Sequence, residues 1–166
     1  MRRTRRNSRR SKKERRAATA KAKKKYQKKP FESDLSGSDV SANLYLSMLT
    51  SEAWRDLTAQ QQRLYTYCKL QLYAEKRKPK DDPAAFTMNK SKWADTYRLY
   101  KRTNARGFYN DMAALIAHGF IICLECGATT RTKSVYKFSS MWQQFGTEAF
   151  TVSRSEMTKA MLNKLP

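Results

Sequence analysis

Four side chains that can form hydrogen bonds with DNA bases lie close together in the sequence, between residues 104 and 110. Arginine pairs bidentately with guanine, and asparagine pairs with adenine, in the major groove of duplex DNA. A helix that reads bases presents such groups near its N-terminus, on the side opposite its buried face. We therefore expect base contacts from Asn104, Arg106, Tyr109 and Asn110.

Basic residues flank this group and could neutralise phosphates. Lys101 and Arg102 directly precede the predicted reading helix, and Arg131 and Lys133 lie in the loop of a predicted hairpin. Contacts with phosphates fix a protein on the duplex without reading its sequence. Asp111 is the one unfavourable charge on the same helix. Further phosphate contacts are expected from N-terminal arginines, namely Arg5, Arg6, Arg9, Arg10, Arg15 and Arg16.

The first 30 residues form a strongly basic segment. They contain 16 of the 35 lysines and arginines and a single acid, Glu14, which gives a net charge of +15. They contain no Leu, Ile, Val, Phe or Trp, so we expect neither a membrane-inserting face nor a signal or transit peptide. Such a composition predicts an arm that is disordered when unbound and attracts nucleic acid. No membrane partner is expected, and the predicted location is the cytoplasm, in association with the nucleoid.

The three cysteines suggest thiols in a reducing compartment, because their number is odd. Cys123 and Cys126 have the spacing of half a zinc site, but a structural site needs four ligands and no second pair exists. The other soft ligands are Cys68 and His118. We expect no metal or other cofactor in the monomer, while a zinc ion shared by two chains stays open.

The residue types also argue against an enzyme. The chain has one histidine and no glycine-rich phosphate loop. Its only adjacent carboxylates, Asp81 and Asp82, lie in a proline-flanked loop without a third acid for a two-metal site. We therefore expect a binding protein.

The elements that must position these residues lie in a predicted domain over 40–145, preceded by a hinge over 31–39 and followed by a tail over 146–166. Residues 40–49 fit a short strand or extended segment, with a helix as the alternative. Thr50 or Ser51 can cap a short helix that ends at Asp56. Thr58 and Gln61 form a capping-box pattern for a helix that extends to about residue 76.

Two further helices and a hairpin complete the domain. Aromatic residues at helical spacing predict a short helix over about 90–97. Thr103 is the candidate N-cap of the next helix, which buries its apolar side and ends at Gly119. Residues 120–124 and 134–138 predict a hairpin. Trp142 and Phe145 are expected to close the core.

This order of elements, and several short motifs, resemble bacterial winged helix-turn-helix DNA-binding domains. Residues 108–112 (Phe-Tyr-Asn-Asp-Met) and 118–121 (His-Gly-Phe-Ile) are similar to the junction of helix and wing. Residues 51–58 are similar to the opening of small domains in replication initiators and accessory proteins of plasmids and conjugative elements. The resemblance covers about residues 44–145. It implies a mainly α fold with a small β-hairpin, sequence-specific binding of double-stranded DNA, and a role in transcription or replication of a mobile element.

The same composition also fits two other functions. A basic arm can also thread structured RNA, as in RNA-binding or ribosome-associated proteins. A structural protein that condenses nucleic acid would depend on the arm alone. The residues also leave open whether the protein forms a homodimer.

Overall fold

The computed structural model describes residues 40–127 and 132–152, and the chain divides into two units, Met1–Asp39 and Val40–Pro166. The predicted arm and hinge, Arg131 and most of the predicted tail lie outside the described residues. In chain order the elements are α2 (Leu46–Leu49), α3 (Glu52–Asp56), α4 (Ala59–Ala74), η1 (Pro79–Asp81), β1 (Ala85–Thr87), the π-helix η2 (Ser91–Thr96), α5 (Ala105–Ala117), β2 (Ile121–Glu125), β3 (Val135–Phe138) and η3 (Met141–Gln144).

Side-chain caps fix where α3 and α4 begin. Ser51 Oγ accepts a hydrogen bond from the backbone N–H of Trp54, as predicted for one of the two candidate caps. The capping box before α4 is also confirmed, because Thr58 and Gln61 each bond to the backbone N–H of the other. The helix ends at Ala74, two residues earlier than predicted. Residues 40–49 were predicted as a short strand or extended segment, with a helix as the alternative. The structure has a helix there only over Leu46–Leu49, which is α2.

The cap of α5 differs from the prediction. Asn104 caps this helix in place of Thr103, and its Oδ1 accepts from the backbone N–H of Gly107 at 3.1 Å. At the other end Gly119 has φ +74°, and the N–H groups of Gly119 and Phe120 donate to the carbonyls of Ile116 and Leu115. This is a Schellman motif, which satisfies the last helical carbonyls. The predicted end at Gly119 is therefore confirmed.

The strands form one antiparallel sheet in the order β1-β3-β2. The predicted hairpin is present as β2 and β3, with an irregularity between Cys123 and Glu125. Strand β1 was not predicted, and it pairs with β3 through Ala85↔Lys137 and two further pairs. The fold is thus helices with a small three-stranded sheet, where the sequence predicted only a two-stranded one.

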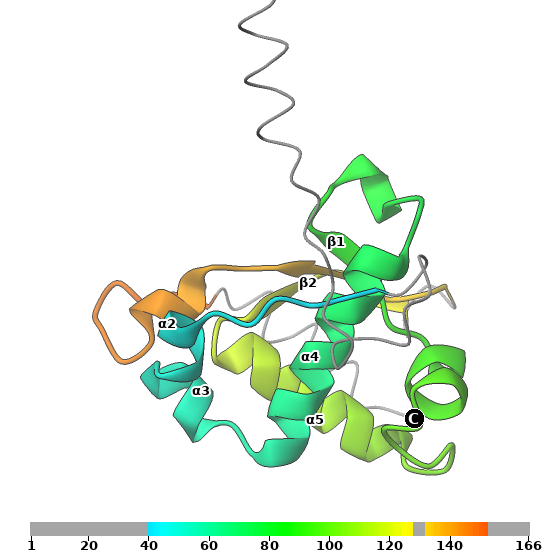
Figure 1. Ribbon diagram of the computed structural model, residues 1–166, viewed down its shortest axis with the longest axis horizontal. Helices are drawn as coiled ribbons and strands as arrows, with labels where there is room; N and C mark the ends of the chain where they lie inside the picture. Colours follow the sequence, from blue (N-terminus) through cyan, green and yellow to red (C-terminus); the bar gives the residue numbers. More distant parts are fainter. Residues whose placement is uncertain (1–39, 128–131, 153–166) are drawn as a thin grey trace, which may run out of the picture. The chain divides into compact units, whose positions relative to one another are not determined.

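The core lies between the sheet and the helices α4 and α5, which contact each other, while α4 contacts β1 and α5 contacts β2 (Figure 1). Trp93 of η2 stacks on Phe108 of α5 with ring centroids 4.8 Å apart, and both are fully buried. Trp142 stacks on Phe120, as expected for a residue that closes the core. No helix in the described part of the chain is both long and apolar enough to cross a membrane.

Candidate nucleic-acid interface

Helix α5 has one buried side and one exposed side. Phe108 and Met112 are buried in the core. Arg106 and Asn110 are exposed and lie four residues apart, so that they share one face about one helical turn apart. The two side chains that match bidentate base recognition best are thus brought together on the solvent side of one helix.

The other two predicted base-reading residues are less available for contacts with bases, because each side chain already has a structural contact. Asn104 is exposed, but its Oδ1 is used by the helix cap, which leaves its amide nitrogen to donate. Tyr109 is half-buried with its ring edge-on to Phe108, at 5.1 Å between centroids. Burial, followed by the nearby Cys126, raises the pKa of Tyr109. Tyr109 therefore packs at the junction of α5 and the hairpin and does not stand out from the helix.

Asp111 was expected to be an unfavourable charge on this helix, and the structure gives it a different role. The hydroxyl of Tyr100 donates to its Oδ2 at 2.6 Å, and the amide Nε2 of Gln61 donates to its Oδ1 at 3.1 Å. Burial, and then the bond to Asp111, raise the pKa of Tyr100. The carboxylate is therefore turned toward α4 and the turn before α5, where it holds three segments together.

The turn between η2 and α5 carries a cluster of cations around an open cavity of about 610 Å³. Arg98, Lys101 and Arg102 line it together with Asp95. Arg102 forms a bidentate ion pair with Asp95, in which both N···O distances are 2.7 Å. Its hydrogen bonds lower the pKa of the Asp95 carboxyl. The predicted phosphate ligand Arg102 is thus already paired, while Lys101 is exposed as expected.

Arg98 is a member of this cluster that the sequence analysis missed. It is exposed and adopts φ +49°, a conformation that non-glycine residues use rarely. The chain turns at this residue directly after η2. Its position immediately after a predicted helix, three residues before Lys101, was the available signal.

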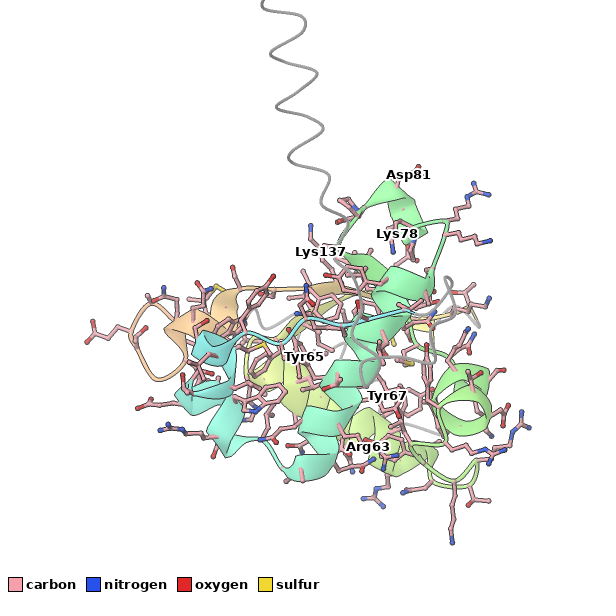
Figure 2. All side chains as sticks on the ribbon, viewed as in Figure 1. Arg63, Tyr65, Tyr67, Lys78, Asp81 and Lys137 are labelled. Atoms are coloured by element: carbon pink, nitrogen blue, oxygen red, sulfur yellow. The ribbon has the colours of Figure 1, made fainter. Side chains whose placement is uncertain are left out.

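Many other described cations already have partners. Lys137 pairs with Asp82 at 2.8 Å, and Lys80 pairs with Glu125. On α4, the guanidinium of Arg63 lies 5.9 Å from the ring centroid of Tyr67, and both residues lie toward the lower end of that helix in Figure 2. Within the residues that the structure describes, no ion pair engages Arg98, Lys101 or Arg106, and the same holds for other exposed cations such as Arg55 and Arg77.

The loop between β2 and β3 holds one described cation. Lys133 is exposed just before β3, whereas Arg131 and the arm arginines lie outside the described residues. The backbone N–H of Gly127 donates to Ser134 Oγ at 3.0 Å and closes the base of the loop. Lys133 is therefore held next to an ordered hairpin base.

The soft ligands do not converge on a common point. Cys123 is buried and its thiol donates to the carbonyl of Glu125, while Cys68 is fully buried in the core. His118 directs its ring nitrogens to the carbonyl of Ala114 and to Asp56. Within 40–127 and 132–152, no three His, Cys, Asp or Glu side chains are placed to share a metal ion.

Comparison with known proteins gives no relative for this chain. No protein family, no curated protein and no solved structure matches it. The evidence for function is therefore the arrangement of its own residues.

Proposed function

We propose that this protein binds duplex DNA in a sequence-specific manner, with α5 as the helix that enters the major groove. The observation that carries the proposal is the exposed face of α5, where Arg106 and Asn110 lie one turn apart near the N-terminus. Arginine and asparagine are the side chains best suited to guanine and adenine, respectively. Asn104 can add one donor beside them, while Tyr109 supports the helix from its half-buried position.

The order of elements supports a winged helix as the fold that presents this face. Helices α4, η2 and α5 are followed by the β2–β3 hairpin, which is the order expected of that class. In this reading the turn before α5 and the hairpin flank the reading helix. Arg98, Lys101 and Lys133, which form no ion pair within the described part of the chain, would then lie beside the phosphates on either side of the groove.

Phosphate contacts and base contacts would have separate tasks. The basic arm, with a net charge of +15, would supply affinity that is independent of sequence and falls steeply with salt. The α5 face would choose the site. By resemblance, the bound site would control transcription or replication of a mobile element, with the protein associated with the nucleoid.

Enrichment of random duplex DNA on the full-length protein tests this proposal. Salt of about 0.15 M and excess nonspecific competitor suppress the contribution of the arm. We expect a short motif to be recovered. Failure to recover any motif, together with tighter binding of structured RNA or equal binding of all duplexes, would contradict the proposal in favour of an RNA-binding or condensing protein.

Arg106→Ala then tests the assignment of the reading face. If Arg106 pairs with a guanine, the variant should lose about 1–3 kcal/mol of binding at one base position and little on other sequences. Arg55→Ala is the matched control, because Arg55 is also an exposed helical arginine but lies on α3. An equal loss on every duplex, or an equal loss in both variants, would assign Arg106 to nonspecific charge.

A further inference from the structure

A second surface feature lies at the opposite end of α5 from Arg106. It is an apolar groove of about 330 Å³ where α5 ends and β2 begins. Ile116 and Ile121, which are almost fully buried, line it together with Ile122, Met141 and Val152. Strand β2 is at the edge of the sheet, so no further strand of the described chain covers this side. A groove of this size and polarity is suited to apolar side chains.

The described part of the chain ends at this groove. Thr151 and Val152 form part of its wall and are the last described residues, and 14 more residues follow in the sequence. A segment tethered at the groove has an effective concentration on the order of millimolar there. This gives it an advantage over any partner that must bind from solution.

The sequence of those 14 residues has a pattern that fits the groove. Residues 153–156 (Ser-Arg-Ser-Glu) match a capping box, in which Ser153 begins a helix. Val152 and Met157 then occupy the two positions of a hydrophobic staple. Met157, Met161 and Leu165 recur every four residues and so share one helical face. The pattern predicts an amphipathic helix whose staple residue, Val152, is already in the groove wall.

We infer that residues 153–166 of the same chain dock in this groove, with Met157, Met161 and Leu165 facing its isoleucines. Methionine suits such a site because its unbranched side chain adapts to irregular apolar surfaces. The polar residues Lys159 and Asn163 fall on the other face of the predicted helix and stay in solvent. The docking does not depend on nucleic acid, and so it stands apart from the function proposed above.

Methyl NMR of the full-length protein tests this inference directly. We expect nuclear Overhauser effects between the methyl groups of Met157 or Met161 and those of Ile121 or Ile122. A sample that mixes labelled and unlabelled protein separates contacts within one chain from contacts between two copies. Contacts that appear only between chains would overturn the inference in favour of a second copy as the occupant. Their absence in the folded wild type would overturn it in favour of an open groove or another ligand.

Two variants with the same change of charge sharpen the test. Met161→Asp should abolish the contacts from Met157 and shift the methyl resonance of Ile122, because a carboxylate on the apolar face opposes docking. Asn163→Asp should leave both unchanged, because position 163 faces solvent in the predicted helix. If the isoleucine resonances are the same in wild type and Met161→Asp, the segment does not occupy the groove.

Discussion

Removal of the Tyr100 hydroxyl is the sharpest test of how α5 is held. Tyr100→Phe deletes one oxygen and leaves the ring, which packs edge-on against Trp93 and Phe108. The hydroxyl donates to the Asp111 carboxylate at 2.6 Å. The substitution therefore leaves a half-buried carboxylate with Gln61 as its one described hydrogen-bond donor.

The expected magnitude follows from the charge of the acceptor. A hydrogen bond to a charged group contributes about 1.5–3 kcal/mol, against about 1 kcal/mol for a neutral pair. We expect Tyr100→Phe to lower the free energy of unfolding by about 2 kcal/mol. For a domain of this size, that corresponds to a decrease of roughly 8 °C in Tm.

Urea unfolding and thermal melting of the full-length protein measure this loss. Tyr45→Phe is the matched control, because Tyr45 is 63% exposed, and it should change the free energy of unfolding by less than about 0.5 kcal/mol. A double-mutant cycle with Asp111→Asn should assign most of the loss to the pair. The reasoning is refuted if Tyr100→Phe is as stable as wild type, or if the control loses as much.

Three further substitutions test the backbone at two glycines and the ion pair between Lys137 and Asp82. Gly119→Ala should lower the free energy of unfolding by more than about 1 kcal/mol, because φ is +74° and an added Cβ would lie 2.7 Å from a backbone nitrogen of η3. Gly146→Ala, at φ +80° but 3.0 Å from the flexible carboxylate of Glu52, should cost less in the same urea titration, and equal losses would refute the steric argument. Asp82→Asn should lower Tm at pH 7 but not in acid, because a hydrogen bond from Lys137, followed by one from a backbone N–H, lowers the pKa of Asp82. The pKa of the Asp82 carboxyl is lower in the folded state than in the unfolded state, where it is near 3.8. The ion pair therefore stabilises the fold above that pH, and this stabilisation is lost as the pH falls through the folded pKa. A difference in Tm between wild type and Asp82→Asn that stays constant from pH 7 to about pH 3 would contradict this.

The elements with local signals could be predicted from the sequence. The capping box of Thr58 and Gln61 is formed within one helical turn, and Gly119 supplies a backbone conformation that its own residue type allows. The N-cap of α5 was predicted one residue too early, at Thr103 instead of Asn104, because both are good capping residues and are adjacent in the sequence. Local chemistry thus predicted the first two helix ends at their exact residues and the start of α5 to within one residue.

The features that depend on distant residues could not be predicted. Strand β1 has three residues, too few for an alternating pattern, and it forms only because β3 pairs with it fifty residues later. The ion pair of Arg102 with Asp95 requires the turn between them to fold back. Most residues of the candidate interface could therefore be named from the sequence, although Arg98 was missed, but the sequence did not indicate which of them are already engaged in ion pairs or caps.

The side chain of Gln61 has a consequence for how this sequence can vary. Its amide oxygen accepts from Thr58 at 2.9 Å, while its amide nitrogen donates to Asp111. A capping box accepts glutamate as readily as glutamine, but a glutamate here would set a second carboxylate against Asp111 and supply no donor. The choice between two residues that are equivalent for the start of α4 is thus decided 50 positions later, on α5. A glutamate at position 61 would therefore need a hydrogen-bond donor, such as an asparagine, in place of Asp111.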